Sequence, residues 1–274
     1  MPHNRFFAVM AALASTALAC QGATNFFSQP ESPRPSSGLA TEPAGADVSA
    51  KVTPTPRRLE LAPTPTAFSV DADDPRSQLD LAHPAHADYF DNPGAWFDYD
   101  TAGRASYAVE NGQLLAKDYE PEEIYVWWSN TDRASGNLYT EITATNGDCI
   151  GKDSVGLAMR IDRDAGAGGY ALEVSCDGAW RFRLLQVGED QVELVDWTPS
   201  PAIEQGPGAT NRIGIWGYEA RFILFVNSAE VGRFWDTHYT YTYGTFAAYV
   251  RASQTYDLTA TFDDFAYWNI DFLP

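Results

Sequence analysis

The sequence is short of basic residues, with 18 Lys and Arg against 37 Asp and Glu and a formal net charge of −19. Lysine is the scarcer of the two, since Lys51, Lys117 and Lys152 are the lysines of the whole chain. Binding to nucleic acid or to an anionic lipid surface requires a patch of positive charge. The composition therefore argues against both functions. Acidity alone identifies no partner, because it also serves solubility.

Motifs of several enzyme classes are missing as well. The chain has no Gly-x-Ser-x-Gly elbow of the serine hydrolases. Its Gly-rich segment 165–169 leads into Tyr170 of a predicted hairpin and not into a helix, which argues against a phosphate-binding loop. A zinc site needs several soft ligands close together. The histidines are scattered along the chain: His3, His83, His86 and His238.

An apolar run near the N-terminus is too short to span a bilayer stably. Arg5 is the one positive side chain before it, Phe6–Ala19 is almost wholly apolar, and small residues precede Cys20. These are the three parts of a secretory signal, so we predict that residues 1–19 are a signal peptide. The end of the run resembles a bacterial lipobox, although Ala17 stands where the lipobox prefers Leu. The resemblance implies acylation of Cys20 and a membrane anchor on the extracytoplasmic face; plain secretion or an uncleaved N-terminus are the alternatives.

A linker follows the predicted signal peptide. Residues 20–82 are rich in Pro, Ser, Thr and Ala, and aromatic residues nearly vanish after Phe27 apart from Phe68. Such a segment has no sustained hydrophobic period and buries too little apolar surface to offset the entropy of ordering it. We predict that it is a disordered tether to a folded domain of residues 83–274.

Short alternating runs bounded by turn residues begin near Asp88. The clearest pair is Ser106–Val109 and Gln113–Ala116, joined by Asn111-Gly112, the strongest short hairpin signal. No segment sustains a helical period over three turns. Further strands are predicted at 122–129, 138–145, 155–161, 170–175, 180–186, 193–197, 212–217, 222–226, 230–236, 245–251 and 257–268. The pattern predicts an all-β fold, an antiparallel two-sheet jelly-roll β-sandwich.

Seven segments in residues 85–270 form a distinctive ordered series. They are Cys149–Asp153, Gly156–Arg160, Gly169–Gly178, Val195–Ile203, Ala209–Gly214, Leu224–Asn227 and Asp263–Trp268. The series resembles the concanavalin A-like, laminin-G-like domains of bacterial surface lipoproteins, which implies a jelly roll with one concave face. Relatives of this fold include lectins, sugar-binding modules and glucanases. The chain departs from the pattern at Ser228, where such domains usually have Gly, and this leaves the hairpin type open.

Two cysteines remain in the predicted domain. If the protein is exported, its compartment is oxidising and favours disulfides. Cys149 and Cys176 can then pair with each other, and no free cysteine remains once Cys20 is acylated. We predict this disulfide, which would stabilise the fold by about 3 kcal/mol. Two buried thiols or a metal pair are the alternatives.

Laminin-G-like relatives often hold calcium, and the resemblance implies such a site here. Asp91, Asp263 and Asp264 are the candidate ligands, because they lie near where the two ends of the domain are expected to meet. Asp-rich turns are also common without metal.

Glucanases of this fold carry a strand with a Glu-x-Asp-x-(x)-Glu motif. Because side chains alternate along a strand, this spacing directs both carboxylates into one groove. No such strand is present, and the nearest, Leu138–Thr145, has only Glu141. We therefore predict no catalytic residue from a motif.

Strand alternation gives a candidate ligand-binding surface instead. On four of the predicted strands, charged residues lie opposite the apolar ones: Glu141, Arg160, Glu173, Arg181 and Arg183. If the strands are neighbours, these charges share one surface, which could hydrogen-bond sugar hydroxyls or position a carboxylate for proton transfer. Cross-strand ion pairs on a solvated face are the alternative. Trp127 and Trp128 point to opposite faces, and an exposed Trp128 beside the charges would suit stacking on a pyranose ring.

Together these patterns predict a surface-displayed lipoprotein whose lectin-like domain binds an extracellular or cell-wall glycan. A glycan hydrolase using Glu141 or Glu173 as acid or base is the first alternative. A protein-interaction or envelope-structural domain is the second, and it would expose an apolar patch and lack a groove.

Overall fold

The structure of the protein is a computed structural model. The predicted signal peptide, the predicted acylation of Cys20 and most of the predicted linker lie outside the residues that it describes. Within the described ranges, no helix is long and apolar enough to cross a membrane. The described residues are 74–121, 126–162, 168–186, 191–238 and 240–271.

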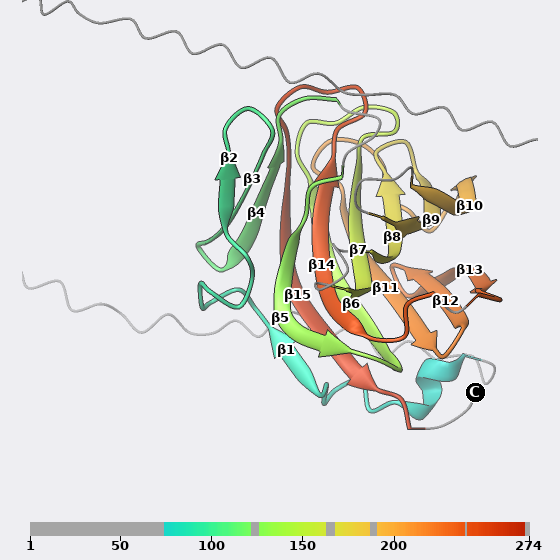
Figure 1. The fold of residues 1–274 in the computed structure, drawn as a ribbon. Coiled ribbons are helices and arrows are strands. Elements are labelled where there is room, and N and C mark those ends of the chain that lie inside the picture. The colour runs from blue at the N-terminus through green and yellow to red at the C-terminus, as the bar shows by residue number, and fades with distance from the viewer. Residues whose placement is uncertain (1–73, 122–125, 163–167, 187–190, 239, 272–274) are drawn as a thin grey trace, which may run out of the picture. The chain divides into compact units, whose positions relative to one another are not determined.

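The described residues form two antiparallel β-sheets that pack face to face (Figure 1). The nine-stranded sheet has the order β13 (Ala229–Trp235), β12 (Arg221–Val226), β11 (Thr210–Tyr218), β6 (Leu138–Asn146), β15 (Leu258–Asn269), β4 (Gln113–Asp118), β3 (Ala105–Glu110), β2 (Tyr99–Thr101), with β1 (His86–Asp88) paired to β15. The six-stranded sheet has the order β10 (Val192–Pro199), β9 (Ala179–Leu185), β8 (Gly169–Ser175), β7 (Ser154–Ile161), β14 (Gly244–Arg251), β5 (Ser129–Ser135). The predicted all-β, two-sheet antiparallel sandwich is confirmed.

The main core lies between the sheets because apolar side chains alternate along each strand. In β8, Leu172 and Val174 belong to this core, whereas Glu173 between them points to the other face. Strands β6 and β11 of the nine-stranded sheet contribute Ile142 and Ile215. Removing this apolar surface from water is the main favourable contribution to folding.

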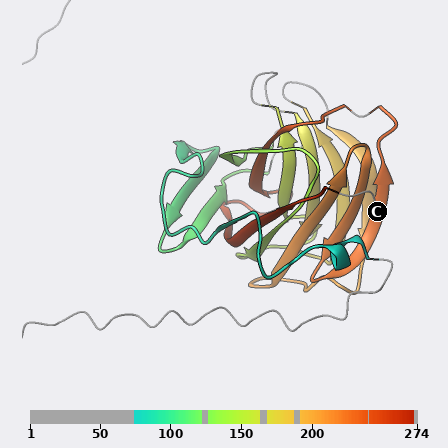
Figure 2. The same cartoon turned by 90° about the horizontal axis from the view of Figure 1, so that it is seen from below.

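The N-terminal segment covers part of the outer face of the nine-stranded sheet. Figure 2 shows this segment, which carries the short 3₁₀ helix η1 (Pro75–Gln78), crossing strands of that sheet. The Arg76 guanidinium carbon lies 3.7 Å from the centroid of the Phe225 ring. Farther along, Trp268 Nε1 donates to the Asp80 carbonyl oxygen at 3.0 Å. Residues 76–80, within the predicted linker, thus pack on the folded domain.

Most predicted strands are present, with bounds that differ by one or two residues from those expected. The exception is the segment predicted at 122–129. Its described part, residues 126–128, belongs to no strand, and the strand in this region is β5, which begins at Ser129. The three-residue strands β1 and β2 were not predicted, because three residues are too few to display an alternation.

Two hairpins share one kind of tight turn. Asn111 and Gly112 have φ values of 53° and 76°, the pair of positive angles that a type I′ turn requires. Asn227 and Ser228 have φ values of 49° and 68°, so the same turn forms although Ser replaces Gly. The Ser228 carbonyl oxygen also accepts a hydrogen bond of 2.7 Å from Arg76. The departure from the family pattern therefore leaves the hairpin intact and places a serine in a left-handed conformation.

The loop before β7 is held in place twice. Cys149 and Cys176 form a disulfide with a Cα–Cα distance of 6.0 Å, as predicted. Next to it, the buried Asp153 carboxylate accepts backbone hydrogen bonds of 2.8 Å from Ser253 and from Gln254. The loop that follows β14 is thereby tied to the disulfide loop, which fixes one end of the six-stranded sheet.

We expect Ser228→Gly to raise the free energy of unfolding by about 1 kcal/mol, because glycine has no Cβ to clash in the left-handed region. Urea denaturation of the full chain measures the change. The matched reverse substitution, Gly112→Ser, should lower stability by a similar amount. Equal stability of Ser228→Gly and the wild type would contradict the prediction.

Candidate functional site

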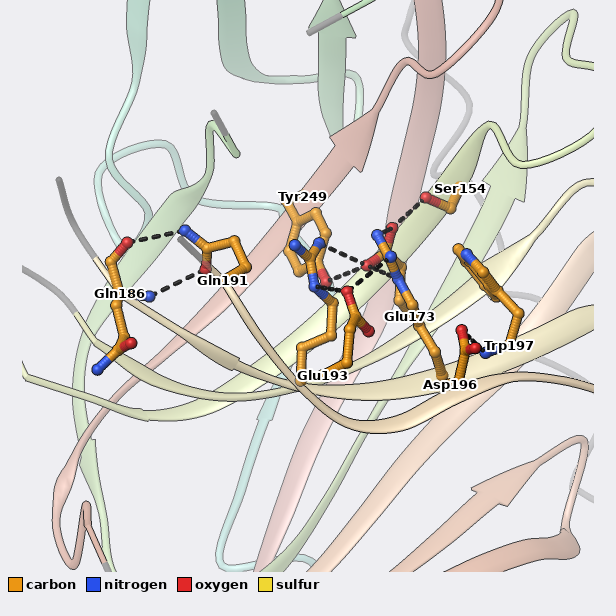
Figure 3. A network of polar contacts seen from close by, with 10 residues as sticks. Ser154, Glu173, Gln186, Gln191, Glu193, Asp196, Trp197 and Tyr249 are labelled. Atoms are coloured by element: carbon orange, nitrogen blue, oxygen red, sulfur yellow. Dashed lines mark hydrogen bonds and ion pairs between the residues drawn. The ribbon is translucent and has the colours of Figure 1, made fainter. Parts of the chain in front are cut away.

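A network of charged side chains lies on the outer face of the six-stranded sheet (Figure 3). Glu173 of β8 stands opposite Arg181 of β9 in the ladder. Arg183 lies two residues farther along β9, on the same face, and stands opposite Glu193 of β10. Every residue of β7, β8 and β9 is buried, so most of this network is removed from water.

The Glu173 carboxylate is at the centre of the network. Its Oε1 atom accepts hydrogen bonds from Ser154 Oγ at 2.5 Å and Arg181 Nη2 at 2.9 Å. Its Oε2 atom accepts from Arg181 Nε at 2.9 Å, Arg183 Nη1 at 3.2 Å and the Tyr249 hydroxyl at 3.3 Å. A fully buried carboxylate persists in its charged form only when it is paired and hydrogen-bonded. Four side chains from β7, β9 and β14 meet this requirement.

The two arginines keep Glu173 ionised. Burial alone would raise its pKa, but the charges of Arg181 and Arg183 and the hydrogen bonds of Arg181 lower the pKa to about 2. Glu173 is therefore a fixed negative charge at neutral pH. It is not suited to donate a proton as a general acid.

Strand β10 forms the exposed rim of the network. It is the edge strand of the sheet, and two register shifts interrupt its pairing with β9. Glu193 Oε1 accepts from Arg181 Nη1 at 3.0 Å, and its side chain is 39% exposed. Burial raises the pKa of Glu193 against the opposing charges of Arg181 and Arg183. Two cations lie against the half-buried Trp197 ring. The Arg181 guanidinium carbon is 4.4 Å from the ring centroid, and Lys152 Nζ is 4.9 Å from it.

Two buried N–H groups of the network have no acceptor among the described residues. The first is Arg183 Nε, which lies 3.2 Å from Glu193 Oε1 without the alignment of a hydrogen bond. The second is Nε of Arg251, which ends β14 opposite Ser154 of β7. Buried N–H groups in folded proteins are nearly always paired. These two are therefore exceptions that call for an explanation.

Glu141 does not belong to this network, and its predicted place on a shared surface is wrong. Strand β6 lies in the nine-stranded sheet, next to β11 and β15, and not beside β7. Glu141 accepts a hydrogen bond of 2.6 Å from Arg212 and one of 2.7 Å from the Tyr139 hydroxyl. Its carboxylate is thus part of an ion pair on the opposite sheet.

Arg160 was also expected on the charged surface, and this too is wrong. Its φ is 56°, at a β-bulge where the pairing of β7 with β14 shifts register. The extra residue reverses the alternation, so Ile161 joins the outer-face cluster in its place. The Arg160 guanidinium carbon lies 5.2 Å from the centroid of the Phe222 ring, and Nη1 donates to the Glu219 carbonyl oxygen at 2.7 Å.

Trp128 lies on the predicted face of the six-stranded sheet. It is half-buried and packs against a small apolar cluster that includes Ala158, Ala247 and Tyr249. Because the Tyr249 hydroxyl donates to Glu173, Trp128 lies close to the network. Trp127 packs on the opposite side, against the main core, as alternation predicted.

The three candidate calcium ligands are not gathered as a metal site. Burial raises the pKa of Asp263, and the charges of Asp264 and Asp91 act in the same direction, so the three carboxylates sense one another. Among the residues that the structure describes, however, no group of three His, Cys, Asp or Glu side chains could hold a metal ion. The Asp264 carbonyl oxygen instead accepts a hydrogen bond of 2.8 Å from Arg212.

The predicted hydrolytic residues do not form a catalytic pair. Glycoside hydrolysis needs two carboxyl groups about 5 to 10 Å apart in one groove. Glu141 and Glu173 lie in different sheets. Glu173 is also completely buried, and both of its oxygens are engaged by neighbouring donors. Glu173 therefore cannot serve as the acid or base that the hydrolase alternative required, and it is not a partner for Glu141.

No known family model matches this chain, and no curated protein matches its sequence. Among solved structures, it is similar to the carbohydrate-binding module CBM66 of Bacillus subtilis, with 17% identity and a TM-score of 0.49 over 65% of this chain and 98% of that chain. It is also similar to the catalytic domain of an endo-1,3-β-glucanase (laminarinase) of Thermotoga petrophila, with 10% identity and a TM-score of 0.48 over 69% of this chain and 98% of that chain. Identities this low assign no role to a residue.

Sequence reasoning missed the part of the network contributed by β10 and β14. Alternation in β14 places Phe246, Ala248 and Val250 in the core, so Tyr249 and Arg251 must face outward. That signal was present in the sequence. What was missing was the neighbour of β14, because β7, its partner, lies far away along the chain.

We expect the stability of the protein to fall as pH drops from about 4.5 to 2, because Glu173 takes up its proton near pH 4.3 when unfolded and only near 2 when folded. This residue then contributes about 3 kcal/mol at neutral pH, which acid removes. Glu173→Gln should lose about 3 to 5 kcal/mol at pH 7, since its arginines remain buried without their counter-charge. Its stability should also depend less on pH over this range. Thermal unfolding at a series of pH values measures both effects.

Glu230 gives a matched control, because it forms an exposed ion pair with Arg233 on β13. Glu230→Gln should change stability by less than about 1 kcal/mol. An acid dependence that is the same in Glu173→Gln as in the wild type would show that other carboxylates govern it.

Proposed function

We propose that the described domain binds an extracellular carbohydrate through the outer face of the six-stranded sheet, at the rim formed by β10. The observation that carries the proposal is that a half-buried Trp197 and a part-exposed Glu193 stand beside the Arg181 and Arg183 guanidiniums. Sites that bind small molecules combine an apolar surface with a few fixed polar groups. An aromatic ring packs against the C–H face of a sugar, and carboxylate and guanidinium groups hydrogen-bond its hydroxyls.

The rigidity of the network supports a binding role. Glu173 fixes both Arg181 and Arg183 from behind, with an ion-pair distance of 2.9 Å to the first and 3.2 Å to the second. Side chains held in this way lose little freedom when a ligand arrives, which favours affinity.

We further propose that the protein is exported and anchored at Cys20, with the domain displayed on the extracytoplasmic side. The Cys149–Cys176 disulfide supports export, because such bonds persist mainly in oxidising compartments. The apolar run Phe6–Ala19 and the small residues before Cys20 support processing at that position.

Trp197→Ala should weaken glycan binding by at least about tenfold, the effect of removing an aromatic side chain from the centre of a binding site. Affinity electrophoresis of the full chain through gels containing different polysaccharides identifies a ligand, and calorimetry then gives the affinity of each variant.

Trp235→Ala is the matched control for this experiment. Trp235 is 63% exposed but lies on β13 of the other sheet, so its loss should leave binding unchanged. If Trp235→Ala abolishes binding and Trp197→Ala does not, the proposed site is wrong. Failure of the wild type to bind any glycan would favour a protein partner.

Expression of the full chain in a bacterial host tests the anchor. The wild type should fractionate with membranes, and mass spectrometry should find an acylated Cys20 at its N-terminus. Cys20→Ala should appear in the soluble extracytoplasmic fraction, because the anchoring group is gone. Retention of Cys20→Ala in the membrane would contradict this proposal.

A further inference from the structure

Arg251 is a buried arginine without an ion pair to any described residue. The residue is 8% exposed, and its Nε–H has no acceptor among the described residues. Among the described residues, no carboxylate lies within ion-pair distance, 4.0 Å, of its guanidinium, and Arg251 donates no hydrogen bond that would replace one. Burying an unpaired charge is costly, so this residue lowers stability unless something else pairs with it.

The carboxylate that acts on Arg251, that of Glu173, is shared with two other arginines. Three arginines of the network, Arg181, Arg183 and Arg251, act on the one buried carboxylate of Glu173. Glu173 and Glu193 are already engaged by Arg181 and Arg183. Arg251 is therefore left without an ion pair of its own among the described residues, although the chain as a whole has a net charge of −19.

The position of Arg251 is fixed by its surroundings. It lies at the end of β14, opposite Ser154 of β7 and on the same face as Tyr249, and both of these neighbours donate to Glu173. The loop immediately after it is held by Asp153 through the backbone of Ser253. The backbone at Arg251 is thus fixed, and its guanidinium can receive a planar oxyanion with two parallel hydrogen bonds.

We propose that the ligand of this domain is an acidic polysaccharide, and that a carboxylate or sulfate group of the sugar pairs with Arg251. The inference rests on the proposed function, since it names the chemical class of the glycan bound at the same face. A neutral sugar would leave the Arg251 charge without an ion pair. An anionic sugar would supply one.

Matched polysaccharide pairs test the inference. The full chain is titrated with polygalacturonate and its methyl ester, and with dextran sulfate and dextran, in about 0.15 M salt, where repulsion from the distant acidic surface is screened beyond about 8 Å. We expect one charged polymer to bind about 10- to 100-fold more tightly than its neutral counterpart, the effect of one charge-assisted hydrogen-bonded pair. Which pair responds distinguishes a carboxylate from a sulfate ligand.

Arg251→Gln should abolish the preference for the charged polymer. Arg221→Gln is the control, because Arg221 is exposed on β12 of the other sheet, and it should keep the preference. The melting temperature of Arg251→Gln should be no lower than that of the wild type, because an unpaired buried charge has been removed. A residue with a purely structural role would lower the melting temperature when replaced.

A second measurement avoids the variant altogether. The melting temperature of the wild type should rise with polygalacturonate or dextran sulfate and not with the neutral partner of that polymer, because binding to the native state stabilises it. Equal binding of charged and neutral polymers would overturn the inference while leaving the proposed carbohydrate function in place. Absence of binding to every polymer would overturn both.

Discussion

Burial of the central strands β7, β8 and β9 on both faces is the constraint on which the rest of the structure depends. All residues of β7, β8 and β9 are buried, so a charge on either face of these strands has little access to water. Glu173 is retained there because Arg181 and Arg183 neutralise it and Ser154 and Tyr249 complete its hydrogen bonds. The pairing in turn fixes where both arginines point, and with them the Trp197 ring at the rim.

Replacing such a network by apolar side chains would give a sheet of similar or greater stability. Arg251 strengthens this point, because it adds a buried charge without an ion pair among the described residues. Features of this kind are expected where binding, and not folding, sets the requirement. The polar face of this sheet thus differs from that of the nine-stranded sheet, where the outer face is covered by the N-terminal segment and carries Trp216, Phe225 and Trp268.

The fold could be predicted from the sequence because it depends on local signals: alternation within strands and Asn-Gly at a turn. The pairing of Glu173 with Arg181 and Arg183 was also accessible, since β8 and β9 form a hairpin. Glu141 was misplaced because strands that follow each other along the chain, β6 and β7, belong to different sheets. Arg160 was misplaced because a bulge reverses alternation without a mark in the sequence. Arg251 was missed because β14 and β7 are neighbours only in the folded chain.

The N-terminal segment and the charged network lie on opposite outer faces of the sandwich, and this has a mechanical consequence. A pull applied through Arg76 enters the nine-stranded sheet at Phe225, whereas a ligand held at Trp197 would resist from the six-stranded sheet. The load between them would cross the packed interior as tension on side-chain contacts. Strand-to-strand hydrogen bonds within each sheet would bear little of it. Resistance to force should therefore depend on how well the two sheets adhere.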